Sequence, residues 1–330
     1  MPNWTLVDNN TVITPTVEAP SKPRALYIYR QSVSEPGIAA VLAPAITPDL
    51  RDQLKLAVRD AVDRSRRCLV TLTGGKDILG QIDTLVSKID QDKSITKTDL
   101  YPILYGHSFA NLGSGKKNGL LTRFFGTKAS GIVGGIDSTY DSAKKNYNTS
   151  MTPSYIFRTV LGTTIIGLNL VNQGIVLGDK AIGSYGDSIT NWDAWKVAIP
   201  NPGLVGYTAE GIIDSLDKAT ATMTQGHLRV NIKYLQDPAK TYDPLHYPGG
   251  VFRNSDMFTL TYIHETSHLF AATSDSYYFN KPWESDGIEE GADNPHNELD
   301  NGKPTTERCL MNADSYAWLI YQLGDTRFSA

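Results

Sequence analysis

His264-Glu265-Thr266-Ser267-His268 is the stretch of this 330-residue sequence that decides its fold class and its chemistry. Two histidines four residues apart lie one turn apart on one face of a helix, so both imidazoles can reach the same tetrahedral ion. The glutamate between them then projects beside the open coordination position, where it can take a proton from water. The pattern predicts a zinc site with its general base, although so short a motif also arises by chance.

The residues around the motif predict the helix that this geometry requires. Ser255 is suited to the N-cap, and Asp256 is suited to the positive end of the helix dipole. Ile263 and Leu269 supply apolar surface to bury, and no proline occurs from 255 to 281. The alternative is a surface helix that carries two histidines by coincidence, and such apolar neighbours argue against it.

The third protein ligand of the metal has several candidates. A third histidine six residues after His268 would complete one known arrangement, but that position is Ser274. A glutamate about twenty residues on would complete a thermolysin-like arrangement, and Glu289 and Glu290 stand there. Asp275 fits a third class, in which the helix ends soon after the second histidine and an aspartate turns back to the ion.

Three ordered motifs near the C-terminal end resemble signatures of the aspzincins, the deuterolysin and peptidyl-lysine metalloendopeptidase family. The first is the H-E-x-x-H motif. Residues 272–279, A-T-S-D-S-Y-Y-F, resemble the family's G-T-x-D-x-x-Y-G, and residues 312–316, N-A-D-S-Y, resemble its N-A-D-S-[HY]. Arg123-Phe124-Phe125-Gly126 is similar to an F-G landmark that precedes them in the family. Three motifs in the family's order are more specific than any one alone.

The resemblance implies a role for each matching residue. The implied zinc ligands are His264, His268 and Asp275. Glu265 would be the general base, and Tyr278 would donate a hydrogen bond to the developing oxyanion. A phenol suits that role because its pKa of about 10 keeps it a neutral donor. Asp314 would line the pocket for the side chain after the scissile bond, where an anion favours Lys or Arg.

The chain departs from the family pattern at three positions. Ala272 and Phe279 replace the two signature glycines, so the backbone around Asp275 must follow a different path or tolerate strain. Ala317 stands where lysine-specific relatives carry a second acid. The prediction is therefore cleavage before Lys or Arg with a modest preference.

The predicted fold class is α+β: a zincin-like metallopeptidase with a helical N-terminal half, a small mixed sheet and an active-site helix that carries the H-E-x-x-H motif. Residues 1–44 are expected to form an extended N-terminal arm with a strand at 25–29. Residues 45–330 are expected to form an aspzincin-like metallopeptidase domain with an insertion around 172–228.

Capping residues and apolar spacing predict individual elements. Thr47-Pro48-Asp49 is a good helix start, and one apolar face continues from it to about Arg67. The same spacing predicts a second helix over 78–89. Strands are predicted at 155–160, 163–171 and 229–235. The last of these is the nearest candidate for an edge strand that pairs with an extended peptide.

Composition limits the partners. A net charge of −4 gives no reason to expect nucleic acid or an anionic membrane, and no stretch is apolar enough for a membrane span. The first ten residues lack the pattern of a signal peptide, whereas family habit suggests a protein that is secreted or delivered outside the producing cell. Cys68 and Cys309 either form one disulfide or remain two buried thiols.

These observations predict a zinc-dependent endopeptidase that acts on protein or peptide substrates. Two alternatives come from other classes. In one, the zinc is structural and the chain is a non-catalytic binding module. In the other, Ser108 would be the nucleophile of a serine hydrolase, although residues 106–110 are one residue short of a nucleophile elbow.

Overall fold

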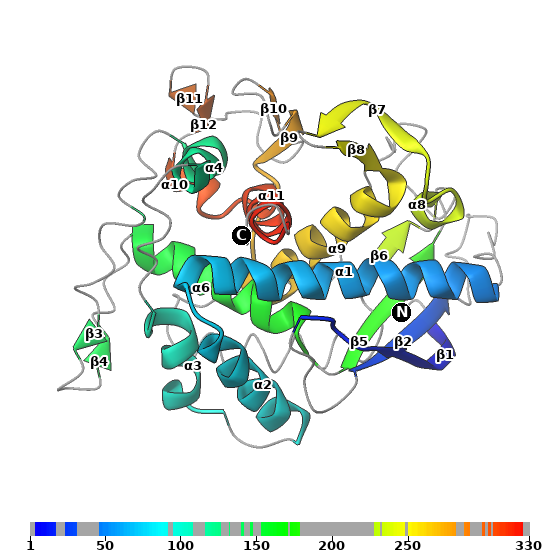
Figure 1. Cartoon of the computed structure of the whole chain (residues 1–330), viewed down its shortest axis with the longest axis horizontal. Helices are drawn as coiled ribbons and strands as arrows, with labels where there is room; N and C mark the ends of the chain where they lie inside the picture. Colours follow the sequence, from blue (N-terminus) through cyan, green and yellow to red (C-terminus); the bar gives the residue numbers. More distant parts are fainter. Residues whose placement is uncertain are drawn as a thin grey trace.

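The structure is a computed structural model. It describes residues 4–17, 24–31, 46–91, 95–107, 116–126, 132, 140–141, 146–147, 153–170, 172–178, 228–231, 233–247, 250–281, 287–290, 299–300, 303–304 and 306–325. In this part of the chain a group of helices lies beside a four-stranded sheet, and short two-stranded ribbons lie around the helices (Figure 1). The arrangement confirms the broad α+β class.

The four-stranded sheet is mixed. Its order is β1 (Trp4–Ile13), β2 (Arg24–Gln31), β5 (Asn172–Gly178) and β6 (Leu228–Asn231). β1 pairs with β2 in antiparallel fashion, whereas β2 pairs with β5 and β5 with β6 in parallel. The strand predicted at 25–29 is confirmed, because it lies within β2. β5 shows that the segment expected as an insertion begins with a central strand, and residues 179–227 lie outside the described residues.

One apolar core joins the sheet to the helices. Ile13, Leu26 and Ile28 of the first two strands are fully buried in the same cluster as Leu54 and Leu319 of the helices. The N-terminal segment expected as an extended arm therefore contributes two paired strands and part of the core.

α1 (Pro48–Thr73) begins where the sequence predicts. The hydroxyl of Thr47 accepts a hydrogen bond from Leu50 N over 3.1 Å, which caps the helix. The helix continues past the predicted end near Arg67, because Leu69 and Leu72 extend its buried face. Gly74 then ends it in the left-handed conformation, with φ of 73°.

A buried arginine joins α1 to the next helix, α2 (Asp77–Asp90), which confirms the second predicted helix. Arg66 is fully buried, and its two terminal nitrogens lie 2.8 and 3.1 Å from the two carboxylate oxygens of Asp83 on α2. Arg66 also donates to Oδ1 of Asn169, which directly follows α6 (Pro153–Leu168). These bonds satisfy a charge that would otherwise be costly to bury.

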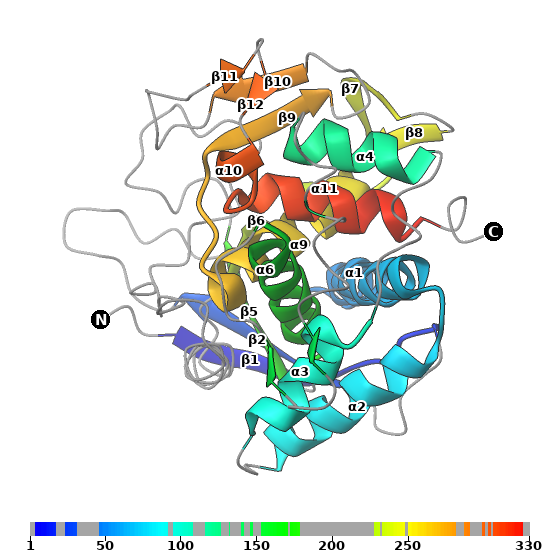
Figure 2. The ribbon, with the colours of Figure 1, turned by 90° about the vertical axis from the view of Figure 1, so that its left-hand side faces the viewer.

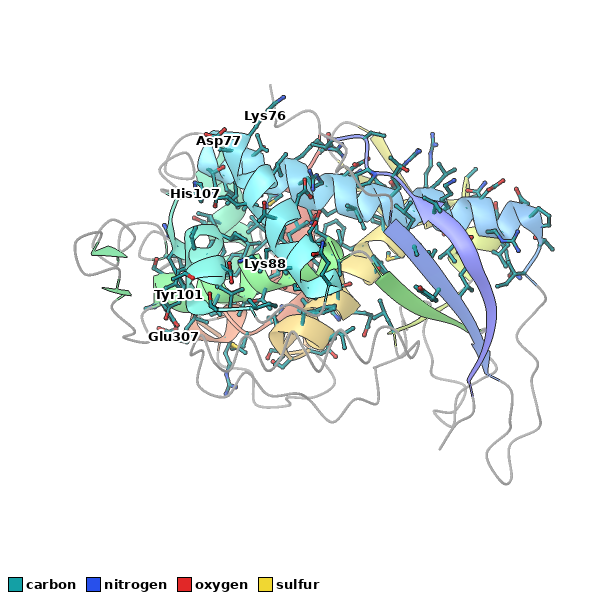
Figure 3. The ribbon with its side chains drawn as sticks, turned by 90° about the horizontal axis from the view of Figure 1, so that it is seen from below. Lys76, Asp77, Lys88, Tyr101, His107 and Glu307 are labelled. Carbon is teal, nitrogen blue, oxygen red and sulfur yellow. The ribbon has the colours of Figure 1, made fainter. Side chains whose placement is uncertain are left out.

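α3 (Lys97–Tyr105) packs against α2, and Lys88 of α2 forms an ion pair with Asp99 of α3. Figure 3 labels Lys88 together with His107, which follows α3. His107 Nε2 lies 3.3 Å from Gln81 Oε1 on α2. His107 thus has a partner in the helical layer, and Ser108 lies outside the described residues.

The strands predicted at 155–160 and 163–171 are wrong, because residues 155–160 and 163–168 lie in α6 (Pro153–Leu168). Residue 171 lies outside the described residues. Residues 157–170 are all buried, so no polar face reveals the helical period. At Gly167 a β-carbon would lie 2.4 Å from the Phe270 ring, so glycine permits close packing on the helix that carries Phe270. Tertiary packing here overrides the strand preference of the β-branched residues.

α9 (Asn254–Ala271) is the central helix and packs against α1, α6 and α11 (Ala313–Leu323) (Figures 1 and 2). It contains residues 264–268, as predicted. Its N-cap is Arg253 instead of Ser255, and Asp256 Oδ2 accepts a hydrogen bond from Arg253 N over 2.8 Å. Asp256 therefore caps this helix through its carboxylate.

The strand predicted at 229–235 is correct only in its first part. β6 ends at Asn231, and α8 (Lys233–Gln236) follows. Leu235 is buried in the core, where α8 packs against α9.

The shorter elements are α4 (Lys116–Phe125), α10 (Thr306–Cys309), β3 (Tyr140–Asp141), β4 (Asn146–Tyr147), β7 (Thr241–Tyr247), β8 (Gly250–Arg253), β9 (Tyr277–Lys281), β10 (Gly287–Glu290), β11 (Leu299–Asp300) and β12 (Lys303–Pro304).

Two arginines of α1 bind the C-terminal end of α11 (Ala313–Leu323). Arg64 Nη1 donates to Tyr321 O over 2.8 Å, and its guanidinium lies 3.7 Å from the centre of the Tyr321 ring. Arg67 Nε donates to Gly324 O. Cations at the carbonyl end of a helix complement its dipole, so these bonds fix α11 on α1.

No helix among the described residues is both long enough and apolar enough to cross a membrane.

Candidate metal centre

The two histidines of the motif face each other on α9. His264 and His268 are one turn apart, their ring centres are 4.7 Å apart, and their Nε2 atoms are separated by 3.0 Å. His264 is buried and His268 is half-buried. This is the convergence of imidazoles that the spacing predicts.

Asp275 turns back towards both histidines from the segment after α9. Its Oδ1 lies 2.9 Å from His264 Nε2 and 2.9 Å from His268 Nε2. The three candidate ligand atoms lie within 4.8 Å of one another. Of the candidates from the sequence, Asp275 is thus brought to the histidine pair. Glu289 and Glu290 lie in β10, whose backbone pairs with β9, and their side chains lie outside the described residues.

The outer nitrogen of each imidazole lies closest to a group that only accepts hydrogen bonds. The Thr273 hydroxyl, which can donate or accept, lies farther from His268 Nδ1, at 3.2 Å. His268 Nδ1 lies 2.7 Å from Thr273 O, and His264 Nδ1 lies 3.0 Å from Asp314 Oδ1. A carbonyl and a carboxylate accept, so the proton of each neutral imidazole belongs on Nδ1, which leaves a lone pair on Nε2. Such outer partners fix the tautomer and orientation of metal-binding histidines.

Two lone pairs and a carboxylate oxygen therefore meet at one point. Groups of like polarity about 3 Å apart in a buried site repel one another unless a cation or protons lie between them. The donor set is thus chemically suited to a metal ion.

Electrostatics favour positive charge at the same point. Burial alone would lower the pKa of His264, but hydrogen bonds with Asp275 and Asp314 outweigh it and raise the pKa well above its ordinary value. Burial would likewise raise the pKa of Asp275. When protons instead of a cation occupy the Nε2 atoms, hydrogen bonds from His264 and His268 hold the pKa of Asp275 well below its usual range. The carboxylate stays ionised and attracts a cation.

The turn that delivers Asp275 uses a strained residue. Ala272 ends α9 with φ of 53° and ψ of 36°, the left-handed conformation that favours glycine. The strain predicted from the missing glycine is confirmed there. It is absent at Phe279, since Ala272 is the one non-glycine residue with positive φ among those described. Phe279 instead packs edge-on against Phe124, with ring centres 5.2 Å apart.

Asp314, which the resemblance assigns to a substrate pocket, lies against His264. It is 7% exposed, and its Oδ1 contacts His264 Nδ1. Its Oδ2 accepts a hydrogen bond from Phe279 N over 2.8 Å. These contacts place Asp314 beside a candidate metal ligand, and its role in a substrate pocket stays a prediction. Ala317, at the position of the missing second acid, is fully buried in α11.

The remaining predicted residues are placed as follows. Glu265 is buried on α9 beside His264. Tyr278 lies in β9, but its side chain is outside the described residues, so its role stays a prediction. The landmark at 123–126 contributes two core residues, because Phe124 packs on Phe279 and Phe125 packs on Tyr316 of α11.

Both cysteines are buried free thiols, so the predicted alternative of a disulfide is wrong. Burial raises the pKa of the Cys309 thiol to about 12. Neither thiol belongs to the group of converging ligands.

Comparison with protein-family models, curated proteins and solved structures finds no match to this chain. The class of the site therefore rests on its own residues. Within the described residues these form a group of two histidines and one aspartate that could hold a metal ion.

Proposed function

We propose that this protein is a single-zinc endopeptidase of the aspzincin type, with a zincin-like fold. The observation that carries the proposal is the convergence of His264 Nε2, His268 Nε2 and Asp275 Oδ1 beside a buried glutamate, Glu265. The three ordered sequence motifs support the same class.

The donor set supports zinc over other ions. Two imidazole nitrogens and one carboxylate oxygen are ligands that zinc prefers, whereas calcium and magnesium take mainly oxygen ligands and more of them. Zinc held by only these three residues would keep one position for water or substrate. Catalytic zinc sites have that open position, and structural zinc sites are closed by a fourth protein ligand.

Each residue of the proposed centre has its own role in catalysis. Zinc, when bound, supplies a Lewis acid that polarises a peptide carbonyl and lowers the pKa of water to about 7. Glu265 accepts the proton of the attacking water and then donates it to the leaving amine. Tyr278 donates a hydrogen bond to the oxygen on which negative charge develops. Asp314 and the carbonyl of Thr273 hold the imidazoles with their Nε2 lone pairs facing inward.

The proposed substrate is an extended peptide. β6 is the last strand of the four-stranded sheet in the part of the chain that the structure describes, and it packs near α9. A peptide that adds to such an edge is bound largely through backbone hydrogen bonds, which suits a protein substrate. The proposal does not include a preference for Lys or Arg, because both oxygens of Asp314 contact the protein itself.

Glu265→Gln tests the proposal, with zinc content and casein cleavage measured in parallel. We expect about one zinc per chain in both forms. Loss of a general base should lower turnover by about 10²- to 10⁴-fold. The matched control is Glu307→Gln, which changes an exposed glutamate on α10 (Figure 3) and should leave both properties unchanged.

Three results would contradict the proposal. Undiminished cleavage by Glu265→Gln would rule out this mechanism. Zinc bound at about one per chain, without hydrolysis across a broad peptide library, would favour the non-catalytic binding module. Inhibition by a fluorophosphonate together with indifference to a chelator would favour the serine hydrolase.

A further inference from the structure

We propose that Asn312 is a positioning residue that sets the metal affinity of the centre by holding the backbone on both sides of Asp275. The inference rests on the proposed zinc site and adds a residue to which the sequence motifs give no role in metal binding.

Asp275 is the candidate ligand that most needs support from elsewhere. His264 and His268 are held by the backbone hydrogen bonds of α9. Asp275 lies between the end of α9 and the start of β9, outside both elements. Its carboxylate can stay on the two imidazoles only if the neighbouring backbone is fixed by other contacts.

Backbone hydrogen bonds fix the residue before Asp275. Ser274 forms a parallel β-bridge with Asn312. Ser274 N donates to Met311 O over 2.7 Å, and Ala313 N donates to Ser274 O over 2.9 Å. Ser274 is therefore bound through both of its backbone polar groups to the residues on either side of Asn312.

The side chain of Asn312 fixes the residue after Asp275. Its Oδ1 accepts a hydrogen bond from Ser276 N over 3.0 Å, and its Nδ2 donates to Ser315 Oγ over 3.1 Å. Asn312 is fully buried and Ser276 is also buried. Loss of the amide oxygen would leave the Ser276 N–H without this partner in a buried site, which favours movement of the segment.

The direction of the side chain distinguishes this role from ordinary helix capping. Asn312 is the N-cap residue of α11, where an asparagine oxygen usually accepts from a backbone N–H of the first turn. Here the side chain makes no such capping bond. Its oxygen is directed across to Ser276 instead, so it serves the segment that carries Asp275.

The test measures zinc affinity by competition with a chelator of known affinity, together with the melting temperature of the zinc-free protein. Asn312→Ala should weaken zinc binding by about 10- to 100-fold, the range found when outer partners of metal ligands are lost. Asn312→Asp should bind zinc at least as tightly as the wild type, because its carboxylate still accepts from Ser276 N. If Asn312→Ala does not fold, Asn312→Ser replaces it, since a hydroxymethyl group is too short to span the same contacts.

Asn169→Ala is the matched control. Asn169 is also a fully buried asparagine at a helix end, and its Nδ2 donates to Ser65 Oγ and to Ile165 O. Its partners are not candidate ligands, so its loss should lower the melting temperature and leave zinc affinity within about threefold.

The results separate this inference from the proposed function. Zinc affinity of Asn312→Ala within threefold of the wild type would overturn the positioning role, as would equal weakening in Asn169→Ala. A wild-type protein that binds no zinc would instead refute the proposed function, and this inference with it.

Discussion

Asp314 Oδ1 lies 3.0 Å from His264 Nδ1, on the opposite side of the imidazole from Asp275. The two carboxylates thus hold one imidazole from both sides. A carboxylate behind a metal-binding histidine fixes the ring and makes its free nitrogen a better donor to the metal. Asp314 therefore belongs to the support of the centre.

Asp314→Asn should weaken zinc binding by about 10- to 100-fold. The amide carries no charge, and its NH2 group would face one of two other donors, the N–H of Phe279 or the Nδ1–H of His264. Competition with a chelator measures this. Asp256→Asn, on the same helix as His264 but bonded to Tyr321, is the control and should keep zinc affinity. If Asp314→Asn keeps its zinc affinity but loses a preference for cleavage before Lys or Arg, Asp314 lines the substrate pocket instead. Mass-spectrometric mapping of cleaved peptides measures that preference.

The third ligand can be decided by two variants. Asp275→Ala should lose zinc binding strongly, since it removes one of three converging donors. Changing Glu289 and Glu290 together to glutamine should leave zinc affinity within a few-fold. Metal content after dialysis measures both. The reverse outcome would move the protein to the thermolysin-like class.

Ala272→Gly should stabilise the protein by about 0.5–1 kcal/mol. Glycine removes roughly 1–2 kcal/mol of left-handed strain at φ of 53° but restores part of the conformational freedom of the unfolded chain. Urea unfolding should show a higher midpoint with an unchanged slope. A lower midpoint would mean that the methyl group contributes packing that outweighs the strain.

Cys68 and Cys309 should not react with a thiol reagent in the folded protein. Both are fully buried, and burial raises the pKa of each thiol, to about 12 for Cys309, so the reactive thiolate is scarce at neutral pH. Colour development with an aromatic disulfide reagent should report no thiol in native protein and two per chain in guanidinium. Fast reaction of a native thiol would show that the chain opens locally.

The sequence predicted those helices whose ends are marked by capping residues and whose buried faces show a regular apolar spacing. α1 follows from the cap at Thr47 and its apolar spacing, and α9 follows from its apolar neighbours and the absence of proline. α6 was missed because it is buried on all sides, so its sequence carries no polar face. The three candidate ligands share a short segment and two of them belong to a recognisable motif.

The supporting residues could not be predicted in the same way. His264 and Asp314 are 50 positions apart, and Ser276 and Asn312 are 36 apart. Their contacts depend on how α11 packs against α9, which no local pattern specifies. The motif resemblance drew attention to Asp314 and Asn312, but it assigned Asp314 to the substrate and gave Asn312 no separate role.

The bonds between residues 311–314 and the segment around Asp275 also set an order of events during biosynthesis. The ribosome delivers α9, with both histidines and Glu265, before it delivers α11. Until α11 docks on α9, the hydrogen bonds from residues 311–314 that hold His264 and the backbone around Asp275 cannot form. For the proposed peptidase, the nascent chain would remain inactive until α11 has been made and has docked on α9, because residues 312–314 complete the support of the centre.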